Sequence, residues 1–103
     1  MSHATVRLAS WSDLPAGRYR DDGPNSGEAF REDVLAPALR DNDSVTLDLN
    51  EVYGLASSWT EEVFGGLVRI NKFTPEQLQK RLDLSLNSPL TVKMIKSYIA
   101  HAA

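Results

Sequence analysis

Residues 52–67 read VYGLASSWTEEVFGGL, and this stretch decides the fold because it predicts a buried strand that runs directly into a helix. From Val63 onward, apolar residues recur at the three-to-four spacing of an amphipathic helix. The paired serines precede that run, where a hydroxyl oxygen accepts hydrogen bonds from the free N–H groups of a helix's first turn. Ser58 is predicted to cap the helix, with Glu61 completing a capping box, which leaves Ser57 free to project.

The pattern of apolar and polar residues before and after this stretch predicts an α/β fold. Alternating apolar and polar residues predict strands at residues 5–10, 44–49 and 82–86. Cap residues followed by helical spacing predict three more helices, beginning at Ser26, Thr74 and Ser88. Pro37 lies inside the first of these, so a kink or an early end is expected near Ala36. A hairpin arm at residues 17–20 and a close approach of another backbone to Gly65-Gly66 are also expected.

The composition is that of one small folded domain. The chain has 103 residues, 42% of them hydrophobic, and its net charge of −3 argues against general binding of nucleic acid. With no cysteine, it has no disulfide, thiol nucleophile or cysteine-ligated zinc. No apolar run approaches the roughly 20 residues that cross a bilayer. We therefore expect a cytoplasmic protein without a membrane segment.

The residues that could carry catalysis are sparse. The two histidines, His3 and His101, lie at opposite ends of the chain and have no nearby ligand cluster, so no metal site is predicted. A serine hydrolase would need a base beside its nucleophile, and phosphate-loop and dinucleotide-binding motifs are absent. We expect a non-enzymatic protein without a cofactor.

Two separated blocks of sequence resemble the STAS-like domain family, relatives of the sulfate-transporter and anti-sigma-factor-antagonist domain. The first comprises GRYR at residues 17–20 and GPNSGEAFR at residues 23–31, and the second is ASSWTEEVFGGL at residues 56–67, after a strand ending near Leu49. The resemblance implies a single STAS-like domain over residues 1–103, with a mixed sheet, helices packed on it, and a flexible start at residues 1–4.

The resemblance also implies a protein partner at the strand-to-helix junction. In regulatory STAS proteins of prokaryotic-type signalling, this partner is often a histidine-kinase-like ATPase, which acts as serine kinase and anti-sigma factor. Phosphate on the junction serine dissociates the pair. Their usual junction is Asp-Ser-Ser-Gly; here its serines are Ser57 and Ser58, with Ala56 in place of the aspartate and Trp59 in place of the glycine. We therefore favour partner binding over a phosphoswitch.

The candidate site follows from this junction. Ser57 is the candidate phosphoacceptor, with a structural hydroxyl as its alternative, and Trp59 is either a buried anchor or an exposed hot spot. Arg18 and Arg20 either meet a phosphate or an acidic partner, or pair with Asp21, Asp22 or Glu28. The candidate partner-binding residues are Gly54, Ser57, Trp59, Glu62, Arg18 and Arg20.

The sequence therefore predicts a regulatory protein-interaction module similar to anti-sigma-factor antagonists. Two alternatives stay open. One is a nucleotide- or anion-binding module that uses Arg18, Arg20 and the helix N-termini at Ser26 and Ser57. The other is a structural homodimer joined through Gly65-Gly66 or through an exposed strand edge.

Overall fold

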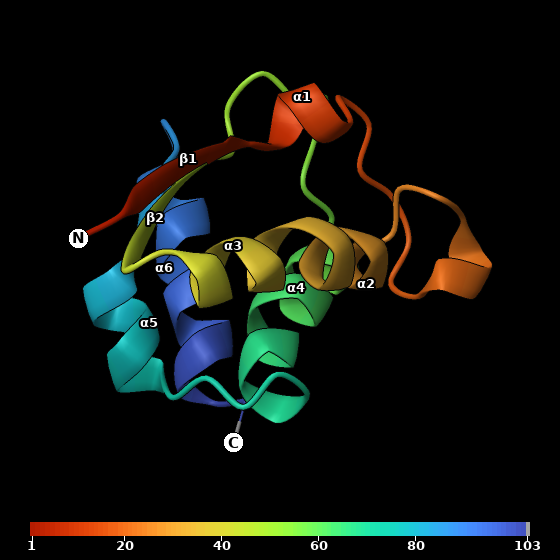
Figure 1. Cartoon of the computed structure of the whole chain (residues 1–103). Coiled ribbons are helices and arrows are strands. Elements are labelled where there is room, and N and C mark those ends of the chain that lie inside the picture. The colour runs from red at the N-terminus through yellow and green to blue at the C-terminus, as the bar shows by residue number, and fades with distance from the viewer. Residues whose placement is uncertain (103) are drawn as a thin grey trace.

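The computed structural model describes residues 1–102, and it contains a three-stranded sheet with helices packed against it (Figure 1). The strands β1 (His3–Arg7), β2 (Ser44–Asp48) and β3 (Leu82–Ser85) lie in the order β1-β2-β3. Both pairings are parallel, so the α/β class is confirmed, whereas the expected mixed sheet is parallel throughout the described residues. The reason is that helical crossovers, not hairpins, connect the strands.

The segment between β1 and the second helix departs from the prediction. Residues 17–20 form no strand and lead into a 3₁₀ turn, η1 (Arg20–Asp22). The first strand is also shifted, since it includes His3 and Ala4, which were expected to be flexible. It ends at Arg7, and the next residues form the short helix α1 (Leu8–Trp11).

The sheet has one buried face and one open face. Val45 and Leu47 of the central strand are fully buried, as predicted, while Ser44, Thr46 and Asp48 point to the opposite side. Helices α2 to α6 gather on one side of the sheet (Figure 1). A parallel sheet is usually covered on both faces, and this one remains partly open because its second face carries polar side chains.

The helix that contains Pro37 widens instead of breaking. It runs as α2 (Gly27–Phe30), a π-helical segment η2 (Arg31–Leu35) and α3 (Ala36–Asp41). Ser26 caps its start as predicted, because its Oγ accepts the Ala29 N–H at 3.1 Å. The Ala36 N–H reaches back five residues to the Arg31 carbonyl. This wider turn accommodates the proline ring and its missing N–H, so no break occurs near Ala36.

Three further helices complete the fold, namely α4 (Ser57–Arg69), α5 (Pro75–Arg81) and α6 (Pro89–Ala100). The predicted starts of α5 and α6 are confirmed. Thr74 and Gln77 form a reciprocal capping box, and Ser88 accepts the Thr91 N–H at 3.3 Å. No helix in the described part of the chain has the length and apolar character that crossing a membrane requires.

The glycine pair in α4 makes room for the charged side chains of Arg31, Glu61 and Arg69, not for a neighbouring backbone. A Cβ atom on Gly66 would lie 2.8 Å from Cζ and 2.9 Å from Cδ of Arg31, and one on Gly65 would lie 2.6 Å from Nη1 of Arg69. The close backbone approach occurs instead at Gly27, where a Cβ would lie 2.7 Å from the Trp59 carbonyl oxygen. Both α4 glycines are buried, so they offer no accessible surface for the dimer contact considered there.

Gly66→Ala should lower the free energy of unfolding by about 1–3 kcal/mol, because its methyl group overpacks the site of the Arg31 guanidinium. Gly54→Ala is the matched control, since a Cβ there meets nothing within 4 Å and the backbone conformation is ordinary. Urea denaturation of the two variants measures the difference. Equal stability of both variants would contradict the role assigned to Gly66.

Candidate functional site

The candidate site lies in the loop between β2 and α4. The strand predicted to run directly into the helix is not formed, because β2 ends at Asp48 and residues 49–56 contain no strand. In open parallel sheets, ligands bind beyond the carboxyl ends of the strands, and this loop lies at that edge. The Tyr53 N–H donates to the Asp13 carbonyl at 2.9 Å, which ties the loop to the segment after α1. Asn50 ties it to the loop after β3, because its Oδ1 accepts the Asn87 N–H at 3.1 Å. The loop is therefore restrained on both sides.

The N-cap of α4 lies two residues earlier than predicted. Ala56 has extended backbone angles and occupies the N-cap position, and no side chain caps the helix. Ser58 is then the second helical residue, so the predicted capping box of Ser58 with Glu61 is wrong. Glu61 is unavailable for capping because its carboxylate binds Arg18 and Arg69. The first turn of α4 also contains no acidic residue.

An exposed patch surrounds this helix start, and we call Leu14, Tyr53, Gly54 and Ser57 the junction surface. Gly54 and Ser57 were predicted site residues, and both are exposed. Leu14 is 57% exposed and Tyr53 is 83% exposed. A hollow of about 290 Å³ adjoins the patch, lined by the loops that follow β2 and β3 and by the first turn of α6. The sequence analysis did not select Leu14 or Tyr53. The only indication that the sequence gives for either one is a large hydrophobic or aromatic residue within a loop.

Trp59 and Glu62 were predicted to contact a partner, and the structure buries both. Trp59 is 0% exposed, its ring lies 5.5 Å from that of Phe30, and its indole N–H donates to the Asn25 carbonyl at 3.0 Å. Of its two expected roles, the buried anchor is therefore the observed one. Glu62 faces inward, where its Oε2 lies 2.6 Å from Nη1 of Arg31.

A network of five charged side chains joins η2 and the Arg18 loop to α4. Arg31, only 2% exposed, donates through Nη1 to the carboxylate and the backbone carbonyl of Glu62 at 2.6 and 2.7 Å. Arg18 bridges Glu61 and Glu62 at 2.6 and 3.3 Å. Glu61 also accepts from Arg69 at 2.6 Å. Positively and negatively charged side chains therefore alternate along the network, from the buried guanidinium of Arg31 to the solvent.

Arg18 and Arg20 do not form one anion site. Arg18 turns toward α4, whereas Arg20 makes a two-pronged ion pair with Asp33 of η2 at 2.8 and 3.0 Å. The expected side-chain pairs with Asp21, Asp22 or Glu28 are not formed, although the Arg20 backbone N–H donates to Glu28. Within residues 1–102, no group of three or more His, Asp or Glu side chains is arranged to hold a metal ion.

The arginines perturb the acids that they contact. Hydrogen bonds from Arg69 and then Arg18 hold the pKa of Glu61 below its ordinary value, against the opposing effect of partial burial. The pKa of Glu32 is also lowered, first by a hydrogen bond from Asn71 and then by Arg31. Both carboxylates are thus held in their charged form by structural contacts, which gives no indication of acid–base catalysis.

Ala56→Asp should raise the free energy of unfolding by about 0.5–2 kcal/mol. A carboxylate at the N-cap accepts a hydrogen bond from an N–H of the first turn, and its negative charge interacts favourably with the positive end of the helix dipole. This change restores the aspartate of the related regulatory junctions. Ser58→Ala, by contrast, should have little effect. Thermal and urea unfolding test both, and a loss of about 1 kcal/mol on Ser58→Ala would restore the capping role to Ser58.

Acidification should remove the contribution of Glu61 to stability. Because its folded pKa is lowered, this contribution is complete above the unfolded pKa of about 4.3 and is lost as the pH falls through the folded value. Glu61→Gln should therefore be less stable than the wild type at pH 7, with the difference shrinking below about pH 4. Urea midpoints at several pH values measure this, and a difference that does not vary with pH would contradict it.

A comparison with protein families identifies the chain. The model of a family described as a STAS-like domain of unknown function, DUF4325, matches residues 26–89, which run from the Ser26 cap of α2 to the first residue of α6. Comparisons with curated proteins and with solved structures found no match. The matched region covers more than half of the chain and includes the whole strand-to-helix junction. The chain therefore belongs to the STAS-like family DUF4325.

Proposed function

We propose that this STAS-like domain is a non-enzymatic regulatory module that binds a protein partner through the junction surface. The partner class that the family resemblance suggests is a histidine-kinase-like ATPase or another anti-sigma-type regulator. The proposal keeps Gly54 and Ser57 from the predicted contacts and adds Leu14 and Tyr53, since these four are accessible. Trp59 and Glu62 are buried, so the proposal assigns neither of them a contact with the partner.

The observation that carries the proposal is the exposure of Tyr53 on a restrained loop. An aromatic side chain offers a large contact area with few rotatable bonds, and tyrosine is enriched among interface hot spots. Tyr53 is 83% exposed, yet its backbone is hydrogen-bonded to Asp13. Little backbone freedom would be lost on binding, and the adjoining hollow of about 290 Å³ provides a concave neighbour for a partner side chain.

Ser57 provides the charge-sensitive element of the proposal. It is exposed at the first position of α4, where the helix dipole favours negative charge. A phosphate there would add about −1.5 to −2 charges in the middle of the junction surface without opposing the fold. Its effect would therefore fall on the partner rather than on the domain's stability.

The anion-binding alternative has weaker support. It relied on Arg18 and Arg20, and each of these guanidiniums is already bound to carboxylates. An incoming anion would have to displace those carboxylates before it could bind. The uncapped start of α4 alone offers no side-chain cation to compensate.

The proposal is tested by affinity capture from native lysate with the wild type, Ser57→Ala and Ser57→Asp, followed by identification of bound proteins. Ser97→Asp, on the exposed part of α6, is the charge-matched control. An ATPase-type regulator should bind the wild type, Ser57→Ala and Ser97→Asp, and its capture should fall at least tenfold with Ser57→Asp. Ser57→Asp should itself be as stable as the wild type or more stable, by about 0.3–1 kcal/mol.

Tyr53→Ala tests the contact area separately from charge. It should weaken the purified complex by about 2 kcal/mol, the size of a hot-spot truncation, as measured by calorimetry. Leu90→Ala, at a residue that is 70% exposed on α6, is the control and should change affinity little. Equal capture by all of these variants, or no capture by any, would overturn the proposal.

A further inference from the structure

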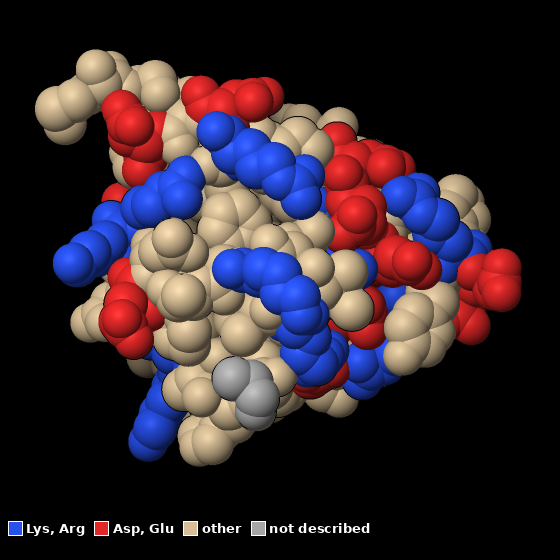
Figure 2. All heavy atoms as spheres, turned by 60° about the horizontal axis from the view of Figure 1, so that its bottom comes forward, with Lys and Arg blue, Asp and Glu red and all other residues tan. Residues whose placement is uncertain are grey.

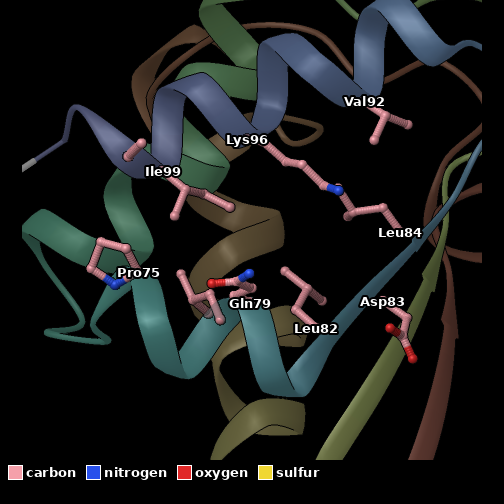
Figure 3. Close-up of a pocket in the computed structure, with 10 residues that line it drawn as sticks. Pro75, Gln79, Leu82, Asp83, Leu84, Val92, Lys96 and Ile99 are labelled. Carbon is pink, nitrogen blue, oxygen red and sulfur yellow. The ribbon is translucent and has the colours of Figure 1, made fainter.

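A second recessed surface lies away from the junction, between α5, β3 and α6. It is a groove of about 400 Å³. Figure 3 shows side chains from both helices and from β3 converging on it, with the Lys96 side chain extending toward Leu84. The apolar part of the lining includes Leu78, Leu82, Leu84, Val92 and Ile99.

The groove runs beside a free sheet edge. Among the described strands β3 pairs only with β2, and the Leu49 N–H donates to the Ser85 carbonyl at 2.9 Å. In a parallel ladder, alternate residues direct their backbone groups to opposite sides. Ser85 and Asp83 therefore bond toward β2, and the N–H and C=O groups of Leu84 face outward. An extended chain laid along this edge would find both a donor and an acceptor there.

A strand added at this edge would present its side chains alternately to the two faces of the sheet. Those on the helical face would enter the groove, where they meet apolar side chains and the aliphatic stem of Lys96. Those on the open face would lie beside Asp83 and Ser85, both of which are exposed. The groove therefore selects apolar residues at every second position, and Asp83 bears on the residues between them.

The open face beside β3 carries negative charge. The strands β2 and β3 contain Asp48 and Asp83 and no Lys or Arg. Asp83 has no ion pair within residues 1–102, and Arg7 of β1 is already paired with Asp48 and Glu51. Figure 2 shows Lys and Arg side chains lying across the face that carries the lower ends of the helices. A basic side chain of an added strand is therefore attracted on the open face, where Asp83 lies, and not on the helical face.

We propose that an extended segment of a partner protein, with apolar and basic residues in alternation, docks as an added strand beside β3. Its backbone pairs with Leu84, its apolar side chains enter the groove, and a Lys or Arg on the open face meets Asp83. Opposite charges on neighbouring strands stabilise the pairing, whereas an acidic residue at the same place would face Asp83 as a like charge. This surface is independent of the junction surface.

A second copy of the chain is a poorer occupant. Its free strand β1, HATVR, has suitable alternation, but its basic side chains are engaged: Arg7 binds two carboxylates, and both ring nitrogens of His3 contact hydroxyls of β2. Two β3 strands paired about Leu84 would bring both copies of Lys96 together, because each extends toward its own Leu84. A separate partner avoids both conflicts.

The probe for this proposal is a ten-residue peptide of alternating valine and lysine with blocked ends. It is titrated into the ¹⁵N-labelled full chain and followed by NMR. The amide signal of Leu84 and those of the groove residues on α5 and α6 should shift. A serine–lysine peptide keeps the charge without the apolar side chains and should not bind. The valine–glutamate peptide should bind at least tenfold more weakly than the valine–lysine peptide.

Backbone methylation of the peptide tests strand pairing directly. If the added strand is antiparallel to β3, its valine amides face Leu84; if it is parallel, its lysine amides do. N-methylation of one set should therefore abolish binding, while N-methylation of the other set should leave it unchanged.

Charge variants separate Asp83 from general attraction to an acidic protein. Asp83→Lys should weaken binding of the valine–lysine peptide about tenfold, because attraction across the strands becomes repulsion. Asp21→Lys makes the same charge change at an exposed position of η1 that does not line the groove, so its effect should be much smaller. Tyr53→Ala should not alter peptide binding, which distinguishes this surface from the junction surface.

Four results would overturn the proposal. Absence of shifts at millimolar peptide would exclude the groove as a strand-addition site. Equal effects of Asp83→Lys and Asp21→Lys, or of the two N-methylated peptides, would show charge attraction without strand pairing. Tighter binding of the valine–glutamate peptide would reverse the assigned charge. A doubling of mass with concentration, lost on Asp83→Lys, would show that a second copy occupies the groove.

Discussion

The buried guanidinium of Arg31 is the interaction on which the rest of the structure depends. A charge removed from water is tolerated only when its hydrogen-bonding groups are satisfied, and breaking such a pair costs about 3–5 kcal/mol. Arg31 therefore requires the carboxylate and carbonyl of Glu62, contact with Glu32, and the absence of a side chain at Gly66. These requirements determine how the helix segment η2 lies against α4.

The position of α4 in turn determines what the domain presents to solvent. The charged network holds the middle of the helix, at Glu62, and Trp59 holds its first turn between Phe30 and the Asn25 carbonyl. Gly27 lets the two helices approach closely at that first turn. With α4 held in this way, its first residue, Ser57, and the loop that carries Tyr53 are left facing outward. The charged residues of α4 near the site are structural, and the accessible ones are neutral.

Local signals in the sequence were sufficient for most elements and insufficient for the site. The strand at residues 44–49 and the start of α5 at Thr74 depend on near neighbours, and both were predicted. Glu61 shows why the site was harder. A capping interaction is worth about 1 kcal/mol, while a hydrogen bond to a charged group is worth about 1.5–3 kcal/mol. Arg18 supplies that stronger bond from 43 positions away, which no local pattern reveals.

The same limit explains the other differences. Pro37 predicts local disruption, but the widened turn that accommodates it becomes visible only with the helix in place. The glycine pair indicates close packing without showing that arginine side chains occupy the space.

Helix α6 links the two surfaces that remain accessible. Its first turn, with Ser88 and Thr91, lines the hollow beside the junction surface, and its later turns, with Val92 and Lys96, line the groove beside β3. Twelve residues of helix span about 18 Å, so both surfaces lie within the reach of one small protein domain.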